Sequence, residues 1–314
     1  MSKGTITILG SNGHIGHHAA QAFHDAGYTV TAFGRSNRRP IPGVSFRQGD
    51  AGSLADVQDA IADADIVFNG LNLQYDQWDR GRAEAQLATV IAAMGQSGKT
   101  LLYPGNVYNY AAGDRRITPS TPQHPQTPRG AIRVRSEEAL LAASKAGKFQ
   151  TIILRAGDFF APHNTADWFD QAMLMEVNKG KIHHLADLDL HHAWAYLPDL
   201  ARAFVVLADQ RAALAACENF HFAGHFVTHG QMMAAIQSAV PRPLKVVPMP
   251  WLILRAMSLT NGIMREILKM RYLWTNEMEL VDPRLDALLG PDFATPLNTA
   301  IAATVQPFLV QKAA

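Results

Sequence analysis

The sequence predicts an α/β fold: a doubly wound parallel sheet, with a small mixed C-terminal lobe after it. Short β-branched apolar runs alternate with longer segments of helical period, a pattern typical of a parallel sheet covered by helices on both faces. A glycine-rich turn separates the first apolar run from the first helical segment, and the alternation weakens after residue 155. With 48% hydrophobic and 18% charged residues, the 314-residue chain can bury a large core, which excludes disorder as its overall state.

Each element of the first half follows from this alternation. The expected strands are 5–10, 28–33, 44–48, 65–69, 100–104 and 150–155. The expected helices are 14–26, 53–62, 78–95 and 130–146, with Ser53 as the N-cap of the second. The Pro- and Thr-rich stretch 117–128 is expected to be a loop over the site, because its prolines lack an N–H donor and fix φ.

The second half is expected to form a smaller lobe, which divides the chain into a first domain over 1–155 and a mainly C-terminal lobe over 156–314, interleaved with it. Helices are expected at 166–178, 199–208, 228–240 and 251–272, with Thr228 as the N-cap of the third. Residues 251–274 mix Trp, Leu, Ile and Met with four basic residues. We favour a helix that packs on the lobe or at a subunit contact. The alternative is a basic amphipathic helix that lies on a membrane surface.

The composition limits the partners and the cellular compartment that are expected. The 28 Lys+Arg against 27 Asp+Glu give 28 − 27 = +1, which argues against a nucleic-acid partner. Cys217 is the single cysteine, which excludes an intramolecular disulfide and a Cys-rich zinc site and favours a reducing, cytoplasmic compartment. The chain enters its first strand without a signal-peptide pattern, and no stretch approaches the ~20 apolar residues of a membrane-spanning helix.

The first turn carries a cofactor motif. The run Gly10-Ser11-Asn12-Gly13-His14-Ile15-Gly16 follows a strand and opens a helix. Glycines there permit a tight turn, close approach of a pyrophosphate and close helix packing, while the helix N-terminus offers free N–H groups. We therefore expect a Rossmann-like dinucleotide site that includes Gly10, Asn12, Gly13, His14, Ile15 and Gly16.

The end of the second strand indicates which dinucleotide binds. Gly34-Arg35 stands where an NAD enzyme usually has a carboxylate, so a 2′-phosphate and hence NADP(H) is favoured, with NAD left open. The alternative is that Arg35 is an ordinary surface arginine. Asp50 is placed either to bind the adenine amine or to be a solvated loop residue, and Asn69 at the end of the fourth strand is assigned to the cofactor site.

At this point the chain resembles the short-chain dehydrogenase/reductase superfamily, in its extended and atypical branches related to NAD-dependent epimerase/dehydratases. Val107-Tyr108 is similar to that family's Ser-x-x-Val-Tyr segment, and the stretches 154–162, 194–203 and 295–297 resemble further family segments. The resemblance covers nearly the whole chain and implies a nicotinamide dinucleotide cofactor and a substrate lobe.

The catalytic positions depart from the family pattern. In register from Val107-Tyr108, the tyrosine of the family's Tyr-x-x-x-Lys pair falls at Arg129, the lysine at Arg133, and the helper serine at Pro104. Tyrosine passes a proton to or from the substrate oxygen, whereas arginine stays protonated at any working pH. The family's usual mechanism therefore does not apply to this chain.

Several interpretations remain open. In the first, Arg133 holds the nicotinamide ribose, and Arg129 stabilises an oxyanion or binds an anionic substrate. The proton then comes from water or from another group, with Tyr108 as the nearest candidate and Tyr110 and Tyr75 behind it. In the second, hydride passes to a quinone-like acceptor that needs little acid catalysis, as in atypical quinone-reductase relatives. In the third, the protein binds NADP(H) without turnover, as a redox sensor of the nitrogen-repression-regulator type.

The favoured prediction is an NADP(H)-dependent oxidoreductase-like protein that reduces a small carbonyl or quinone. A nucleotide-sugar epimerase is disfavoured because its chemistry depends on the missing tyrosine. A structural alternative is that both arginines form surface ion pairs with Glu137 or Glu138. The sequence allows a homodimer without specifying one.

Substrate residues are sought at strand ends. His163-Asn164 leaves the carboxyl end of a parallel strand, where open α/β sheets bind ligands, so His163 is either a substrate-site acid or base or a surface loop histidine. Trp168 is assigned to an apolar wall of the same site, with core packing of the lobe as an equal alternative. Tyr75 completes this set. The spacing of His221, His225 and His229 suits a metal only on one helix, and because a strand and turn are expected there, no metal site is predicted.

Overall fold

The computed structural model describes residues 2–74, 77–163 and 167–310, and these form two compact units. The first unit comprises Met1–Gly105, Pro128–Arg155 and Leu200–Phe220. The second comprises Asn106–Thr127, Ala156–Asp199 and His221–Ala314. The chain passes between the units several times, so neither unit is a single continuous segment.

The first unit is built on a mostly parallel seven-stranded sheet with the order β11-β7-β5-β4-β1-β2-β3. β1 pairs with β2 on one side and β4 on the other, so the strand order reverses beside β1, the point at which such sheets bind ligands. The strands are β1 (Thr5–Leu9), β2 (Thr29–Gly34), β3 (Ser45–Gln48), β4 (Ile66–Asn69), β5 (Thr100–Asn106), β7 (Gln150–Ala156) and β11 (Cys217–His221).

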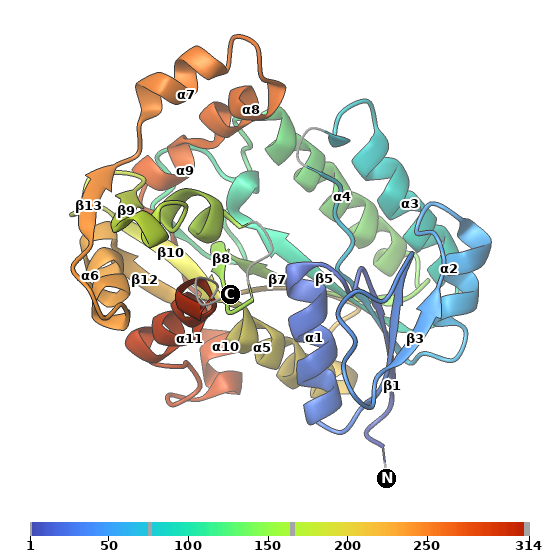
Figure 1. Cartoon of the computed structure of the whole chain (residues 1–314). Helices are drawn as coiled ribbons and strands as arrows, with labels where there is room; N and C mark the ends of the chain where they lie inside the picture. The colour runs from blue at the N-terminus through green and yellow to red at the C-terminus, as the bar shows by residue number, and fades with distance from the viewer. Residues whose placement is uncertain (1, 75–76, 164–166, 311–314) are drawn as a thin grey trace. The chain divides into compact units, whose positions relative to one another are not determined.

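Helices cover both faces of this sheet. Figure 1 shows α2 (Leu54–Ile61), α3 (Arg82–Met94) and α4 (Pro128–Lys145) following one another along one face, with α1 (His14–Asp25) on the other. Successive side chains of β1 point to opposite faces of the sheet. Leu9 belongs to the buried cluster under α2 to α4, and its buried neighbour Ile8 points to the opposite face. The predicted doubly wound fold is confirmed.

The predicted strand and helix positions in this unit are met within one or two residues, with one clear exception. Ser53 caps α2 as expected, its hydroxyl accepting from the Asp56 N–H at 3.3 Å. The helix predicted from residue 78 instead begins at Arg82, because Arg80 and Gly81 have φ of 60° and 74° and left-handed backbone cannot continue an α-helix. α4 begins at Pro128, two residues early, since the fixed φ of proline suits a first helical turn.

The second unit has three small sheets. β10 (His191–Tyr196) pairs antiparallel with β12 (His225–Thr228) and parallel with β8 (Asp158–Phe160), which makes a mixed sheet. The parallel pairs are β9 (Lys181–His184) with β13 (Lys245–Pro248), and β6 (Arg116–Ile117) with β14 (Glu279–Leu280). Apart from β6, the stretch predicted as a loop before α4 carries no regular element.

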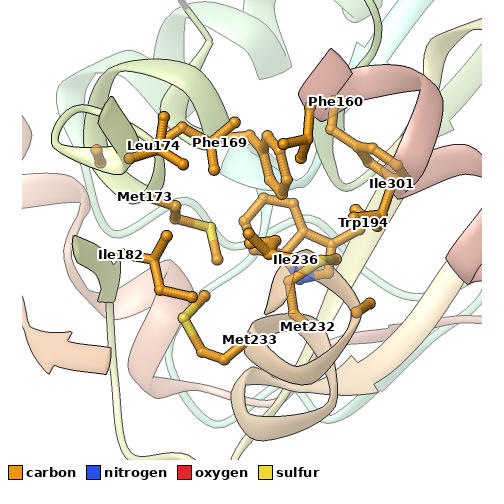
Figure 2. Packing of buried hydrophobic residues seen from close by; sticks show 14 of the residues in the cluster. Phe160, Phe169, Met173, Leu174, Ile182, Trp194, Met232, Met233, Ile236 and Ile301 are labelled. Atoms are coloured by element: carbon orange, nitrogen blue, oxygen red, sulfur yellow. The ribbon is translucent and has the colours of Figure 1, made fainter. Parts of the chain in front are cut away.

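An apolar cluster rich in aromatic and Met side chains forms the core of the second unit. Figure 2 shows Phe169 and Trp194 in contact, with Met232 and Ile236 of α6 (His229–Ala239) beside them. The rings of Phe169 and Trp194 meet edge to face with centroids 5.8 Å apart. Thr228 is the N-cap of α6, as predicted, and the structure adds the reciprocal bond from Gln231 that completes a capping box.

Two predicted helices of this unit are wrong. The described part of the stretch 166–178, residues 167–178, forms a π-helical turn (Phe169–Met173) and a 3₁₀ turn (Val177–Lys179), and Leu174 after the π turn belongs to the apolar cluster. The stretch 251–272 is divided because the Asn261 side chain accepts from the Met264 N–H and starts a new helix. The resulting helices are α7 (Trp251–Met257), α8 (Gly262–Met270) and α9 (Tyr272–Thr275).

The remaining helices are α5 (Leu197–Asp209), α10 (Pro283–Leu289) and α11 (Leu297–Val310), and α5 contains the helix predicted at 199–208. Within the described residues, none of the helices combines the length and apolar character needed to cross a membrane.

Candidate functional site

The three glycines of the β1–α1 turn have different structural tasks. Gly10 is left-handed (φ 79°), and a Cβ there would lie 2.8 Å from the Gly70 carbonyl oxygen. A Cβ on Gly16 would lie only 2.3 Å from the Gly10 carbonyl oxygen, so α1 packs directly on the turn. Gly13 has ordinary extended backbone with a Cβ position 3.2 Å from the same oxygen. The first and third glycines thus permit close packing, and the second keeps the exposed mouth of the turn free of side chains.

The N-terminus of α1 faces this turn with the properties of an anion site. Gly13 is its N-cap and provides no side-chain acceptor, and the first turn contains no acidic residue. The amides at the start of a helix have no intrahelical acceptor, and the helix dipole favours negative charge there. His14 is buried and Ile15 half-buried at this end of the 12-residue helix. A phosphate group is the ligand that this arrangement suits.

Asn12 joins the glycine turn to the loop that follows β2. Its amide nitrogen donates to the Ser36 carbonyl oxygen, and its amide oxygen accepts from the Arg38 N–H at 3.0 Å. The side chain therefore fixes one loop against the other. Sequence reasoning assigned Asn12 to the cofactor and did not foresee these contacts.

The loop after β2 is basic. Gly34 ends the strand, so no carboxylate stands there, and Arg35 and Arg38 are exposed. Arg39 is half-buried, its pKa is lowered by burial, and its buried Nη1 meets no hydrogen-bond acceptor among the described residues. These three guanidinium groups belong to the loop that Asn12 holds.

Asp50, assigned to the adenine, lies in an exposed loop after β3. Its carboxylate accepts from the Gly52 N–H at 2.9 Å, and its own N–H donates to Asp56 at 2.8 Å. Those bonds shape the loop and leave the side chain at the surface.

A pocket lies at the carboxyl ends of β4 and β5, against α4. Arg133 donates from Nη1 to the Tyr103 hydroxyl oxygen at 2.9 Å, and its guanidinium stacks over the Trp78 ring at 4.6 Å. The pocket is narrow, with a cavity volume of about 30 Å³. Its lining includes Asn69, Leu71, Trp78, Tyr103, Arg133 and Ser136.

This pocket adjoins the glycine turn. A Cβ on Gly10 would lie 3.0 Å from the Leu71 nitrogen, and the Asn69 side chain accepts from that same N–H at 3.3 Å. Asn69 and Leu71 also line the pocket, so the pocket and the glycine turn share a boundary. The structure thereby brings the predicted residues Gly10, Asn69 and Arg133 together.

Tyr103 is the residue of this group that sequence reasoning missed. It directly precedes Pro104, where the family's helper serine falls, and it is buried. The available signal was alternation along β5, which places Tyr103 on the same face as Leu101, under α4.

Arg129 is a buried residue, with a relative exposure of 1%, and its guanidinium carbon lies 5.7 Å from the Trp78 ring centroid. Arg129 is therefore not a surface arginine, as one alternative expected. Glu137 pairs instead with Arg155 at 2.6 Å, and both side chains are buried.

The tyrosines proposed as proton donors after β5 belong to the second unit. Tyr108 is half-buried in the 3₁₀ turn η2 (Val107–Asn109), and its N–H donates to the Asn106 side chain. Tyr110 is buried, with its hydroxyl 3.4 Å from His221 Nε2. Burial, followed by the neighbouring Tyr108 and Asp114, raises the pKa of Tyr272 above its usual range.

The predicted substrate residues are only partly described. His163 is exposed with left-handed backbone (φ 63°), an unusual conformation for histidine. Trp168 packs edge to face on Trp274 with ring centroids 5.1 Å apart, as a core residue does. Tyr75 and Asn164 lie outside the described residues.

The three histidines spaced four apart do not share a helix. His221 ends β11, His225 begins β12 and His229 begins α6. His221 Nδ1 lies 3.2 Å from the Ile117 carbonyl oxygen, and His229 Nε2 lies 3.4 Å from that of Trp274. The helical arrangement that would have suited a metal therefore does not form.

The parallel sheet with a glycine turn at its switch point is a Rossmann-like fold of the extended short-chain dehydrogenase/reductase type. The sequence model of the NAD dependent epimerase/dehydratase family matches residues 6–221, and the chain belongs to this family.

Individual relatives are distant. Short-chain dehydrogenase/reductase family 42E member 1 of Xenopus laevis is 36% identical over 70 residues, which are 22% of this chain and 18% of that protein. UDP-glucose 4-epimerase from Brucella ovis, solved in complex with NAD, has a TM-score of 0.78 and 14% identity over 97% of this chain and 98% of its own. The UDP-glucose 4-epimerase of Thermus thermophilus, also solved in complex with NAD, has a TM-score of 0.73 and 17% identity over 99% and 100%. At these identities the structures establish a shared fold.

Proposed function

We propose that this protein binds NADP(H) across the β1–α1 turn and uses it to reduce a small carbonyl or quinone substrate. The observation that carries the proposal is the cradle between Gly10, Gly13 and Gly16, which a Cβ would fill and which opens onto the N-terminus of α1. The NAD complexes of the structurally similar epimerases support a nicotinamide dinucleotide as the cofactor.

The basic loop after β2 supports the phosphorylated form of the cofactor. Arg35 is exposed at the end of the strand, and the buried Nη1 of Arg39 is available to an acceptor. A 2′-phosphate supplies acceptors that guanidinium groups bind in pairs. Asp50 and His14 remain proposed contacts of the adenosine and pyrophosphate parts.

Tyr103 and Arg133 replace the family's proton donor in this proposal. When bound, NADPH supplies a hydride to the carbonyl carbon. Tyr103 donates its phenolic proton to the carbonyl oxygen, and Arg133, 2.9 Å from the phenol oxygen, stabilises the phenolate that is left. Trp78 holds the guanidinium in place from one face, and water returns the proton to Tyr103.

Other assignments stay proposals within this scheme. Tyr108 is the second candidate proton donor, and Arg129 acts as a buried positive charge behind Trp78. His163, Asn164 and Trp168, together with Tyr75, are proposed for the substrate. A cytoplasmic setting and a homodimer belong to the same proposal.

The burial of Arg129 favours a second candidate function, an NADP(H)-responsive protein without turnover. A buried guanidinium fills the position at which the family places its catalytic tyrosine. Such a protein would change its partner or its oligomer equilibrium when NADPH binds, with no substrate reduced.

The test is NADPH oxidation, followed by absorbance, with a panel of small aldehydes, ketones and quinones. We expect turnover by the wild-type protein, a loss of about 10² to 10⁴ in kcat for Tyr103→Phe, and a smaller loss for Tyr108→Phe. NADPH binding should be unchanged in both variants. Binding without turnover on the whole panel would reject the enzyme and favour the sensor.

A further inference from the structure

The α7–α8 hairpin exposes large apolar side chains. Leu252 and Leu259 are 83% and 82% exposed, and Ile253 and Met257 are 60% and 45% exposed. These four lie within eight consecutive residues, whereas the other exposed large apolar residues of the described chain are scattered singly. A contiguous apolar surface of this kind marks a contact with an apolar partner.

The orientation of α7 is fixed by its first residue. Trp251 donates from its ring nitrogen to the Leu185 carbonyl oxygen at 3.2 Å and stacks on Trp274 with ring centroids 5.7 Å apart. The guanidinium carbon of Arg271 lies over the same Trp251 ring, 4.9 Å from its centroid. Because Trp251 is held inward, the next two side chains, Leu252 and Ile253, point out to solvent.

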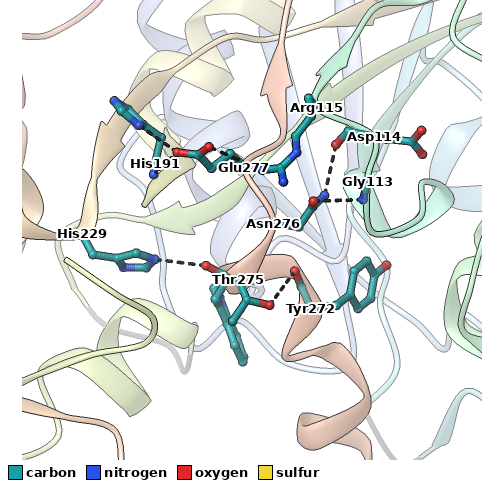
Figure 3. A network of polar contacts seen from close by, with 10 residues as sticks. Gly113, Asp114, Arg115, His191, His229, Tyr272, Thr275, Asn276 and Glu277 are labelled. Carbon is teal, nitrogen blue, oxygen red and sulfur yellow. Dashed lines mark hydrogen bonds and ion pairs between the residues drawn. The ribbon is translucent and has the colours of Figure 1, made fainter. Parts of the chain in front are cut away.

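The chain leaving the hairpin is also anchored. Figure 3 shows Asn276 bonded to the segment 113–114: it accepts from the Gly113 N–H at 3.0 Å and donates to the Asp114 carbonyl oxygen at 3.1 Å. Glu277 accepts from the His191 N–H at 2.9 Å. Hydrogen bonds therefore hold the chain to the second unit on both sides of the hairpin.

The hairpin also concentrates positive charge. Residues 251–271 contain four basic residues and one acidic residue, 4 − 1 = +3, so the rest of the chain carries +1 − 3 = −2. The single acid, Glu266, pairs with Lys269 at 2.7 Å. The basic residues are Arg255, Arg265, Lys269 and Arg271, all exposed.

We propose that the α7–α8 hairpin docks the protein on an anionic lipid surface, which is the interpretation that the sequence placed second to packing on the lobe or at a subunit contact. The exposure of Leu252 and Leu259 favours it, because neither side chain is packed on the lobe. Leu252, Ile253, Met257 and Leu259 would enter the boundary between headgroups and acyl chains, while the basic residues meet lipid phosphates. A second copy of the chain is a poorer occupant, because two identical hairpins facing each other would bring their positive charges together. The proposal is independent of NADP(H) chemistry.

The test is co-sedimentation of the full chain with vesicles of phosphatidylcholine alone or mixed with phosphatidylglycerol. We expect binding to be at least about tenfold stronger on the anionic vesicles. The double variant Leu252→Ser/Leu259→Ser should lose about tenfold or more, while Leu288→Ser, an exposed leucine on α10, should bind as the wild type does.

Charge is tested separately. Arg255→Gln/Lys269→Gln should lose the preference for anionic vesicles, whereas Arg82→Gln, an exposed arginine on α3, should keep it. Equal binding to both vesicle types, or full binding by the leucine double variant, would overturn the proposal. A dimer in light scattering that Leu252→Ser/Leu259→Ser abolishes, with no vesicle binding, would assign the surface to a second copy instead. Near-UV circular dichroism checks that each variant is folded.

Discussion

Replacing Gly16 by alanine would place a methyl group where backbone already lies. The new Cβ would be 2.3 Å from the Gly10 carbonyl oxygen and 2.9 Å from the Gly10 carbonyl carbon, whereas ordinary contact begins at 3.4 Å. The start of α1 must therefore move away from the turn by about 1 Å. Overpacking of this size costs about 1–3 kcal/mol of stability.

The same movement takes the first amides of α1 out of reach of a bound phosphate. Loss of one charge-assisted hydrogen bond, about 1.5–3 kcal/mol, weakens NADPH binding by roughly 10- to 100-fold. NADPH fluorescence titration measures the affinity, and urea unfolding measures the stability. Gly13→Ala, with its Cβ at 3.2 Å from the same oxygen, should retain more stability than Gly16→Ala.

The matched control is Gly262→Ala, where an added Cβ meets nothing within 4 Å. We expect it to leave NADPH binding unchanged. If Gly16→Ala bound NADPH as tightly as the wild type and unfolded at the same urea concentration, the packing of α1 on the glycine turn would not be what holds the cofactor.

Three further changes test the rest of the structure. Arg155→Met should lower the free energy of unfolding in urea by about 3–5 kcal/mol, because it leaves Glu137 charged and buried; the double variant with Glu137→Leu should recover much of this. Burial lowers the pKa of His229 from 6.5 to about 4, so between these two pH values the unfolded chain binds more protons than the folded one. The free energy of unfolding should therefore fall by about 3 kcal/mol from pH 7 to pH 4. His229→Gln should remove this pH dependence when unfolding is measured in urea. Thr228→Ala, which breaks the capping box of α6, should cost about 1 kcal/mol in thermal unfolding.

Each of these has a contradicting result. An Arg155→Met protein as stable as the wild type would mean that the ion pair does not form in solution. A His229→Gln protein with the wild-type pH slope would assign that slope to other groups. No loss in Thr228→Ala would mean that packing alone sets the start of α6.

The sequence predicted the features that depend on residues close together in the chain. The doubly wound sheet follows from apolar runs, and the caps at Ser53 and Thr228 follow from hydroxyls placed before helical periods. The glycine turn was recognisable because its residues contact their own neighbours in sequence. Gly10 and Gly16 are six positions apart, and their packing is a property of the turn itself.

Contacts between distant segments were not predictable in the same way. Trp78 and Arg133 are 55 positions apart, and no periodicity marks their stacking. Asn12 reaches the loop after β2 only because β1 and β2 are adjacent in the sheet. The break at Asn261 was missed because the apolar pattern continues through it. The Asn261 side chain accepts a hydrogen bond from the Met264 N–H and so begins a new helix there.

Calorimetric titration of the purified protein with NADPH and NADH tests the central claim most directly. We predict that NADPH binds, that it binds more tightly than NADH, and that Arg35→Ala weakens NADPH binding while leaving NADH binding unchanged. Gly13→Val, which fills the mouth of the turn, should abolish binding of both. Failure of the wild-type protein to bind either dinucleotide would contradict the account, because the glycine turn would then have only a structural role.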